Sequence, residues 1–297
     1  VEAVLARALK GGADFAEVYA QRAKKRRMKV RQGALEEALS GLDYGAGVRL
    51  FFGTEVVYAY TNDLTQEGLM EALETLLRAK GALGKVDEGG KGGLDFRKAT
   101  PKGLHAPKVP YGEKDKRYRL ERLLEAEAGA RIAPAIKQVE ASILEWEEEV
   151  LVANTEGVFA EEKRVRTRLF VLAVAQDGAE VQTGYSAPGK SVGLELFDLY
   201  PPKAVGEKAA RQALTNLKAR PAPAGTFPVV VGPGFGGVLF HEAVGHLLET
   251  TSVARKASVL ADKLGEVVAS PAVTYIDDGT LPHAWGSTEM DDEGRPT

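Results

Sequence analysis

Long stretches in which apolar and polar residues alternate constrain the fold of this chain more than any other feature. They cover residues 139–154, 158–176 and 179–187, and the short turns between them contain Gly157 and Gly178. Alternation with a period of two is the pattern of a half-buried β-strand, and glycine suits the positive φ that such turns need. Because strands joined by short turns pair antiparallel, we expect a sheet of long antiparallel strands in this part of the chain.

The first 80 residues predict a smaller unit that also combines helix and strand. Apolar residues at helical spacing predict a helix over residues 1–10. The pattern then changes to strands from Phe15 to Tyr60, with tight turns expected at Gly33 and at Gly53. An antiparallel sheet packed against helices is therefore expected at this end of the chain.

Further amphipathic helices are expected along the chain. Leu64–Ala79 carries its apolar residues on one face, and Asn62-Asp63 before it offers an N-cap. Two more helices are expected over residues 113–131 and 203–219. Residues 81–112, which precede the helix expected at 113–131, are rich in glycine and proline. This composition predicts a linker or a long loop.

Shorter strands are expected in two later segments. Phe227–Val231 is predicted as a strand that runs directly into GPGFGG and the helix after it, and the residues from Val267 onward are predicted as strand and loop. The acidic run Glu147–Glu149 could form an acidic binding face, but a solvated strand edge is the better interpretation because runs of like charge usually face solvent.

Charge and composition narrow the classes of function. Lys and Arg total 39 and Asp and Glu total 42, and the net charge of -3 argues against direct nucleic-acid binding. No window approaches 18 consecutive apolar residues and no signal peptide is apparent, so we expect a cytoplasmic protein without a membrane segment. The absence of cysteine excludes disulfides and thiolate ligands within these residues. Scarce Asn, Gln and Met beside many charged residues indicate a heat-adapted protein, from a thermophile.

Two of the four histidines lie in the sequence HEAVGH. His241 and His246 flank this motif, and Glu242 directly follows the first histidine. Imidazoles are good zinc ligands, and a catalytic zinc needs about three protein ligands plus a water. A neighbouring carboxylate can take the proton of that water while the metal lowers its pKa. We therefore expect a metal site with Glu242 as general base; the alternative is two unrelated polar residues on a partly buried helix.

The spacing of the two histidines sets a condition on the backbone. Residues five apart on a regular α-helix point about 140° away from each other. The rings can share one ion only if the helix widens to a π-turn or ends there, and Gly245 favours either distortion. We expect this helix to form even without metal because its apolar residues become buried, namely Val238, Leu239, Val244, Leu247 and Leu248.

A third ligand is not decided by the residues alone. Glu249 lies three residues after His246 and could either ligate the ion or hold the imidazole in place. Other candidates are His283, Asp277-Asp278 and Asp291-Asp292. His105 lies in the segment rich in glycine and proline, where we expect a surface histidine.

GPGFGG satisfies the glycine spacing of a dinucleotide-binding fingerprint through Gly232, Gly234 and Gly237. No strand that ends in an acidic residue follows about 20 positions later, and no βαβ series surrounds the motif. A tight turn that brings the backbone close to the histidine helix is therefore the better interpretation. A nucleotide-binding α/β protein remains an alternative.

Together these patterns predict an α+β fold. An N-terminal unit of antiparallel sheet and helices is expected over residues 1–80, followed by a linker over residues 81–112. Residues 113–297 are expected to form a larger mixed α/β unit with the long antiparallel strands and the metal-site helix. The last residues stop within a loop, and we expect that a C-terminal part is missing.

Several segments resemble one known family. FHEAVGHLLE at 240–249, with GPGFGGVL before it, is the most specific, and VASPAVTYIDDGT at 268–280 and DDEGRPT at 291–297 support it. GVRLFF and ANTEGV add to the likeness, which extends over nearly the whole chain. The sequence resembles the TldD/PmbA family, also called the modulator of DNA gyrase family, and in particular its TldD-type members, because PmbA-type members lack HEAVGH.

The resemblance implies a cytosolic zinc metallopeptidase that cleaves unfolded peptides and leader segments. It implies that His241 and His246 are zinc ligands, that Glu242 is the catalytic base, and that one zinc is bound per complete chain. It also implies a heterodimer with a PmbA-type (TldE) subunit, with self-association as a dimer as the alternative.

This chain departs from the family at the third zinc ligand. The resemblance implies that this ligand is a cysteine far toward the C-terminus, whereas the chain has no cysteine. Family chains also continue for roughly another domain beyond the DDEG loop. We therefore expect the 297-residue chain to hold zinc weakly and to be inactive alone. The alternative function is a non-catalytic peptide-binding or regulatory subunit with an incomplete metal site.

Overall fold

The computed structural model describes residues 1–81, 94–99 and 102–297. The chain forms two compact units. Unit 1 consists of residues 1–219 and 278–297, and unit 2 consists of residues 220–277. Residues 82–93 and 100–101, which belong to the expected linker, lie outside the described residues. Among the described residues, no helix is both long and apolar enough to cross a bilayer.

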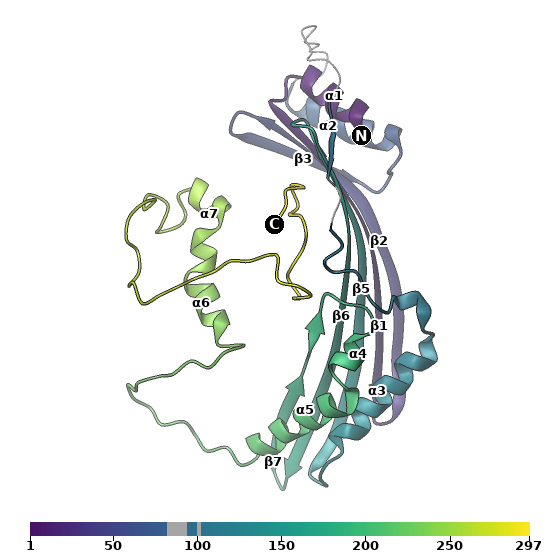
Figure 1. The fold of residues 1–297 in the computed structure, drawn as a ribbon, viewed down its shortest axis with the longest axis vertical. Helices are drawn as coiled ribbons and strands as arrows, with labels where there is room; N and C mark the ends of the chain where they lie inside the picture. The colour runs from purple at the N-terminus through teal and green to yellow at the C-terminus, as the bar shows by residue number, and fades with distance from the viewer. Residues whose placement is uncertain (82–93, 100–101) are drawn as a thin grey trace. The chain divides into compact units, whose positions relative to one another are not determined.

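Unit 1 is built on one eight-stranded sheet (Figure 1). Its main path runs β3-β2-β1-β5-β6-β4, and β7 and β8 also pair with β6. Only the β4–β6 pair is parallel among the described strands. The strands are β1 (Phe15–Arg31), β2 (Ala34–Phe52), β3 (Glu55–Thr61), β4 (Arg97–Ala99), β5 (Ile136–Asn154), β6 (Val158–Asp177), β7 (Glu180–Ser186) and β8 (Gly189–Lys190).

The turns expected at glycines are present. Gly157 lies between β5 and β6 with φ of 88°, and Gly178 lies between β6 and β7 with φ of 57°. A side chain at Gly157 would also place a Cβ atom 2.5 Å from the carbonyl oxygen of Asp95. The expected antiparallel pairing of the long strands is confirmed, and the α+β fold class with it.

Pairing between β1 and β5 joins the early strands to the later ones. Their ladder extends from Glu17 opposite Asn154 to Arg31 opposite Glu140. One sheet therefore contains strands from both sides of the segment 81–112. The division of the chain into domains at that segment stays a prediction.

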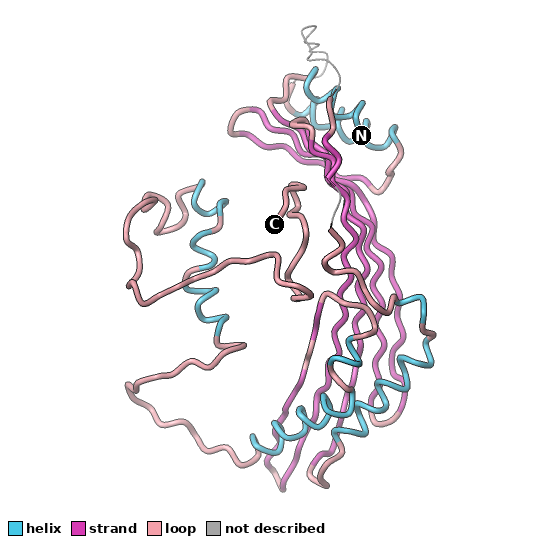
Figure 2. The backbone as a smooth tube through the Cα atoms, in the orientation of Figure 1, coloured by secondary structure: helices cyan, strands magenta, loops and turns pink. Residues whose placement is uncertain are grey.

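The helices of unit 1 cover parts of this sheet (Figure 2). Helix α2 begins later than expected, and its N-cap is Thr65 rather than Asn62 or Asp63. The Thr65 hydroxyl accepts the Gly68 N–H at 3.1 Å, while Asp63 accepts the Thr65 N–H instead. The helices are α1 (Glu2–Lys10), α2 (Gln66–Ala79), α3 (Lys116–Ala130), α4 (Leu196–Leu199) and α5 (Pro202–Asn216), with a 3-10 turn η1 at Tyr111–Glu113.

Two large apolar clusters hold these helices on the sheet. One joins α3 and α5 to β5 and β6 and includes Leu123, Ile143 and Leu169. The other joins α1 and α2 to β1 and β2 and includes Leu5 and Leu73. Burial of each such side chain contributes about 1.5–3 kcal/mol, so the packed faces are a large part of what stabilises unit 1.

The acidic run Glu147–Glu149 lies in a central strand, so the expected strand edge is wrong, although Glu149 is exposed as expected. Strand β5 lies between β1 and β6 in the sheet. Glu148 is buried, where Gln21 donates to it and the Arg166 guanidinium lies 3.6 Å away. Basic residues on the neighbouring strands offset the acidic charge, and this pairing is not visible in local sequence.

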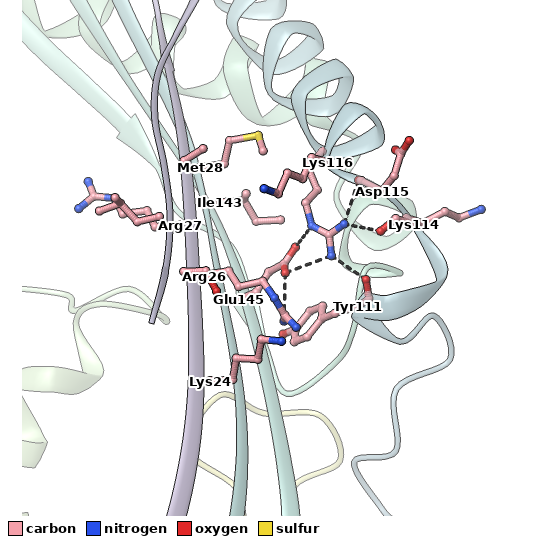
Figure 3. A pocket seen from close by; sticks show the side chains of 14 residues that line it. Lys24, Arg26, Arg27, Met28, Tyr111, Lys114, Asp115, Lys116, Ile143 and Glu145 are labelled. Carbon is pink, nitrogen blue, oxygen red and sulfur yellow. Dashed lines mark hydrogen bonds and ion pairs between the residues drawn. The ribbon is translucent and has the colours of Figure 1, made fainter. Parts of the chain in front are cut away.

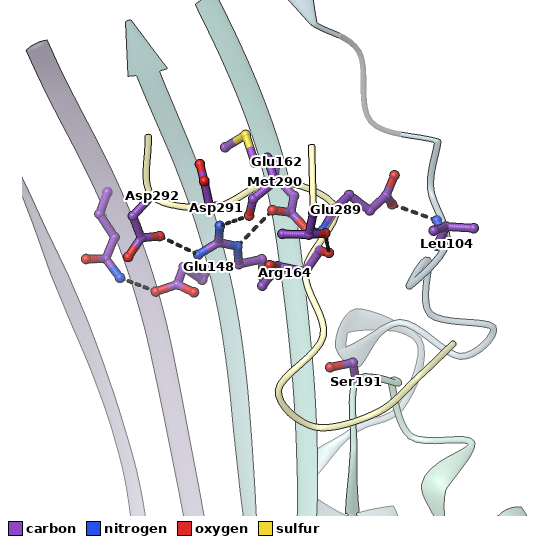
Figure 4. A network of polar contacts seen from close by, with 12 residues as sticks. Leu104, Glu148, Glu162, Arg164, Ser191, Glu289, Met290, Asp291 and Asp292 are labelled. Carbon is purple, nitrogen blue, oxygen red and sulfur yellow. Dashed lines mark hydrogen bonds and ion pairs between the residues drawn. The ribbon is translucent and has the colours of Figure 1, made fainter. Parts of the chain in front are cut away.

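The last 20 residues, which belong to unit 1, contact its sheet through side chains and do not form a strand ladder (Figure 4). Arg164 donates to the Met290 carbonyl at 2.9 Å and to Asp292 at 3.2 Å. Glu162 accepts the Glu289 N–H at 2.8 Å. The strand expected from Val267 onward is absent from the described residues there, which form only an isolated bridge between Met290 and Pro296.

His105 is buried in unit 1 rather than exposed, and the expectation of a surface histidine is wrong. It is 5% exposed, and its Nδ1 accepts the backbone N–H of His283 at 3.2 Å. Burial lowers the pKa of His105. The segment that contains His283 returns from far along the chain, so local composition around His105 does not reveal its burial.

Candidate metal centre

Unit 2 carries HEAVGH on a short helix that ends inside the motif. Helix α6 (Gly237–Ala243) is followed by a break at Val244, where φ is -132°, and then by the 3-10 turn η2 (Gly245–Leu248). Helix α7 (Thr250–Ala254) follows after Glu249. Of the two distortions considered for this segment, a widened turn or a helix end, the structure has the helix end. The regular 140° separation of the rings no longer applies, because the backbone changes direction between them.

The break brings the two imidazoles together. The ring centroids of His241 and His246 are 4.4 Å apart. Gly245 lies against the first ring: a Cβ atom there would be 3.1 Å from His241 Nδ1 and 3.0 Å from the Tyr275 hydroxyl. Such contacts are tighter than ordinary packing, so Gly245 permits the close approach of His241 to the following turn.

Two carboxylates lie beside His246, one at each ring nitrogen. Glu242 Oε2 is 3.5 Å from His246 Nε2. Glu249 Oε1 is 2.7 Å from His246 Nδ1, a hydrogen-bond distance. This hydrogen bond, together with the negative charge of Glu249, raises the pKa of His246. A carboxylate that holds Nδ1–H leaves Nε2 as the ring nitrogen with a free lone pair.

The donor set fits a divalent metal ion. His241, Glu242 and His246 each offer one ligand atom, and these atoms all lie within 4.8 Å of one another. Imidazoles are common zinc ligands, and a carboxylate beside them can either ligate the ion or act as general base. All three residues are exposed to solvent.

Four of the five other candidate ligands from the sequence have partners of their own. In unit 1, His283 Nδ1 is 3.2 Å from the Ser191 carbonyl oxygen, and Asp292 pairs with Arg164. Asp291 accepts backbone N–H groups of its own turn, and so does Asp278. Asp277 is exposed at the end of unit 2.

The apolar residues around the motif are not buried, and that expectation is wrong. Leu239 is 60% exposed and Leu248 51%. Within unit 2, all of whose residues are described, Ser258 alone is buried. Phe227–Val231 likewise forms no strand, and Val230 is 97% exposed. A strand needs a hydrogen-bonded neighbour, and residues 220–277 contain only short helices and irregular backbone.

Three family models match successive parts of the chain. They describe the PmbA/TldA metallopeptidase domain 1 over residues 16–80, its central domain over residues 108–217, and its C-terminal domain over residues 224–297. The last of these contains HEAVGH.

Curated relatives agree with this match. The metalloprotease TldD homolog of Haemophilus influenzae is 33% identical over 294 residues, which cover 96% of this chain and 60% of that protein. A metalloprotease of Methanothermobacter thermautotrophicus is 30% identical over 282 residues, with 95% and 60% covered. The chain thus spans about 60% of the length of these relatives.

Solved structures share the fold. TldE from Thermococcus kodakarensis matches with a TM-score of 0.73 and 19% identity, over 100% of this chain and 65% of that one. A protein of Thermotoga maritima named a modulator of a DNA gyrase matches with a TM-score of 0.75 and 20% identity, over 99% and 65%. These structures show the fold, and the three family models show the family: the chain belongs to the PmbA/TldD metallopeptidase family.

Proposed function

We propose that this chain carries the metal-binding motif of a cytoplasmic zinc-dependent peptidase that cleaves unfolded peptides or leader segments. The observation that carries the proposal is the convergence of His241, Glu242 and His246 within 4.8 Å at a helix break. The names of the curated relatives, which are metalloproteases, support the same chemistry.

Each residue of the site has a distinct task in this proposal. His241 and His246 hold the zinc ion, and Glu249 fixes the orientation and tautomer of the His246 ring through Nδ1. When bound, zinc supplies Lewis-acid activation of water and of the scissile carbonyl. Glu242 is the general base: it takes a proton from the water that attacks the peptide and returns it to the leaving amine.

Glu249 is better suited to orientation than to ligation. The two nitrogens of an imidazole point in divergent directions, and Glu249 lies at Nδ1 while Glu242 lies near Nε2. A third ligand then has to come from another residue, and the family resemblance implies a cysteine beyond the residues of this chain. We therefore propose that peptidase activity requires this additional ligand, and we expect weak zinc binding by the 297 residues alone.

The proposed assembly is a dimer. The match to a TldE structure supports a PmbA/TldE-type subunit as the partner, and self-association is the alternative. A non-catalytic peptide-binding or regulatory subunit is the second candidate function, because the side chains of Glu242 and His246 are 63% and 49% exposed. A site so open to water is weakly organised for catalysis.

Substitution of Glu242 tests the proposal in the full-length chain. Glu242→Gln keeps the shape of the side chain but removes the base, so we expect bound zinc to remain while hydrolysis of an unfolded peptide falls roughly 100-fold or more. Zinc content is measured by mass spectrometry of the metal and activity by peptide cleavage.

Two further variants separate the roles of the neighbouring residues. Glu249→Ala should weaken zinc binding roughly 10- to 100-fold through loss of ring orientation. His241→Ala combined with His246→Ala should abolish zinc binding and activity. Full activity of Glu242→Gln would assign the proton transfer to another group, and stoichiometric zinc in the double variant would refute the ligand assignment.

A further inference from the structure

A basic pocket lies in unit 1 where the start of α3 meets the sheet (Figure 3). Its volume is about 480 Å³, and residues of β1, β2, β5 and α3 line it. No lining residue belongs to unit 2. Volumes of about 300–1,000 Å³ are typical of pockets for small ligands. The cationic lining residues are Lys24, Arg26, Arg27, Lys114, Lys116 and Arg119.

The floor of this basic pocket is apolar. The strand register places Met28 of β1 opposite Ala38 of β2 and Ile143 of β5, so the three side chains share one face. Met28 and Ile143 are buried, and the buried ring of Tyr111 continues this surface. An apolar floor gives a ligand with a hydrocarbon part a surface on which to exclude water.

The centre of the pocket carries more positive than negative charge. Glu145 is 1% exposed and accepts two hydrogen bonds from Arg119, one of them at 3.1 Å. Arg26 Nη1 lies 3.6 Å from the same carboxylate. One buried carboxylate thus serves two guanidinium groups, which leaves a net positive charge.

Arg26 is the guanidinium with unused hydrogen-bonding capacity. Arg119 also donates to the backbone carbonyls of Tyr111, Lys114 and Asp115, so its role is structural. Arg26, by contrast, has only the 3.6 Å ion pair between its Nη1 and Glu145, and this nitrogen makes no hydrogen bond; the guanidinium lies 5.4 Å from the centre of the Tyr111 ring. A buried donor of this kind is costly unless an acceptor reaches it.

The rim adds charge that the protein itself does not neutralise. Among the residues that the structure describes, none forms an ion pair with Lys24, Lys114 or Lys116. The carboxylate of Asp115 is engaged as the N-cap of α3, where it accepts a backbone N–H at 2.9 Å. Cations gathered around a concave apolar surface raise the local concentration of anions and strengthen their hydrogen bonds.

We propose that this basic pocket binds a small organic anion. The anionic group lies between Arg26, Lys24 and Lys116, whose side chains point into the pocket in Figure 3, and the apolar part lies on Met28 and Ile143. Carboxylates and phosphate monoesters share this chemistry. The proposal does not rest on the proposed peptidase function, because it concerns other residues and is measured without turnover.

Calorimetric titration of the 297-residue chain tests the proposal, with octanoate, octyl phosphate and inorganic phosphate as probes below their micellar concentrations. We expect an octyl anion to bind more tightly than inorganic phosphate, and to bind more weakly as salt is added. The stronger of the two octyl probes identifies carboxylate or phosphate as the preferred group. Absence of binding by both octyl probes would overturn the proposal.

Two matched pairs of charges locate the binding. Lys24→Gln with Lys116→Gln removes two cations that point into the pocket and should weaken binding roughly tenfold or more. Lys203→Gln with Lys208→Gln removes two exposed cations from α5 and should leave binding unchanged. Equal affinities in the two double variants would show nonspecific association and refute the site.

A third variant tests the apolar floor without a change of charge. Ala38 is exposed on a strand, so Ala38→Phe should fold while its ring fills the pocket. We expect loss of octyl-anion binding with an unchanged circular dichroism spectrum. Undiminished binding of the octyl probe to this variant would show that the anion does not use the pocket.

Discussion

Unit 1 and unit 2 differ in how they bury their side chains. Unit 1 has two large apolar clusters, and buried charges such as Glu145 and Arg164 are paired with opposite charges. Unit 2, by contrast, buries one residue of its 58 and exposes most of its large apolar side chains. The stabilising interactions of the chain and its candidate metal ligands are therefore in different units.

This difference has a consequence for the candidate metal centre. Positions of catalytic groups are held most accurately by packed neighbours. In unit 2 the helix break after Ala243 and the hydrogen bond between His246 and Glu249 position the candidate ligands locally. Exposed apolar side chains such as Phe235 and Leu239 mark surfaces that further protein could cover.

Loss of a buried charge partner should be the strongest test of the contrast between the units. Arg119→Met leaves Glu145 buried with only the more distant Arg26, so we expect a loss of about 3–5 kcal/mol in the free energy of unfolding. Denaturant unfolding measures this loss. The control is Arg117→Met on the same helix, where the side chain is 84% exposed and its pair with Glu121 contributes about 0–1 kcal/mol.

An equally small effect in both arginine variants would contradict the interpretation of Arg119 as a structural residue. It would also mean that water or Arg26 stabilises the Glu145 carboxylate in place of Arg119. The same comparison extends to unit 2, where the exposed pair of Lys263 and Glu266 predicts a change as small as that of Arg117→Met.

Matched leucine truncations compare the two units directly. Leu169→Ala removes a fully buried side chain and should cost about 2–5 kcal/mol. Leu239→Ala on α6 should change the free energy of unfolding by no more than about 0.5 kcal/mol, because the side chain is 60% exposed. A large cost for Leu239→Ala in the same unfolding experiment would show that α6 is packed in solution.

Local patterns in the sequence are sufficient for the elements that depend on neighbours along the chain. Alternation and turn glycines predict β5, β6 and β7, and an amphipathic pattern predicts α5. In the candidate metal centre, the five-residue spacing and Gly245 predict a distorted helix between the histidines, which in the structure is a helix end. Each of these depends on backbone conformation within a few residues.

Features that depend on distant segments cannot be predicted in this way. The burial of Glu148 requires that β5 lies between β1 and β6, and the burial of His105 requires the returning segment around His283. The apolar pattern of Phe227–Val231 is suited to a strand, but a pattern cannot supply the neighbouring strand. The apolar face of α6 is a similar case: the sequence predicts that this face is buried, but it does not identify the segment that packs against it.

Titration of His105 gives the smallest expected effect, which is a dependence of the stability of unit 1 on pH. Burial lowers the pKa of His105, so the unfolded chain binds a proton more readily than the folded chain. The contribution of neutral His105 to the free energy of unfolding is therefore complete above the ordinary pKa of about 6.5. This contribution is lost as the pH falls through the lower pKa of the folded chain. We expect unit 1 to lose stability below about pH 6.5, as measured by denaturant unfolding at several pH values. His105→Asn keeps an acceptor for the His283 N–H but cannot titrate, so it should flatten this dependence; an unchanged pH profile in that variant would assign the acid sensitivity to other groups.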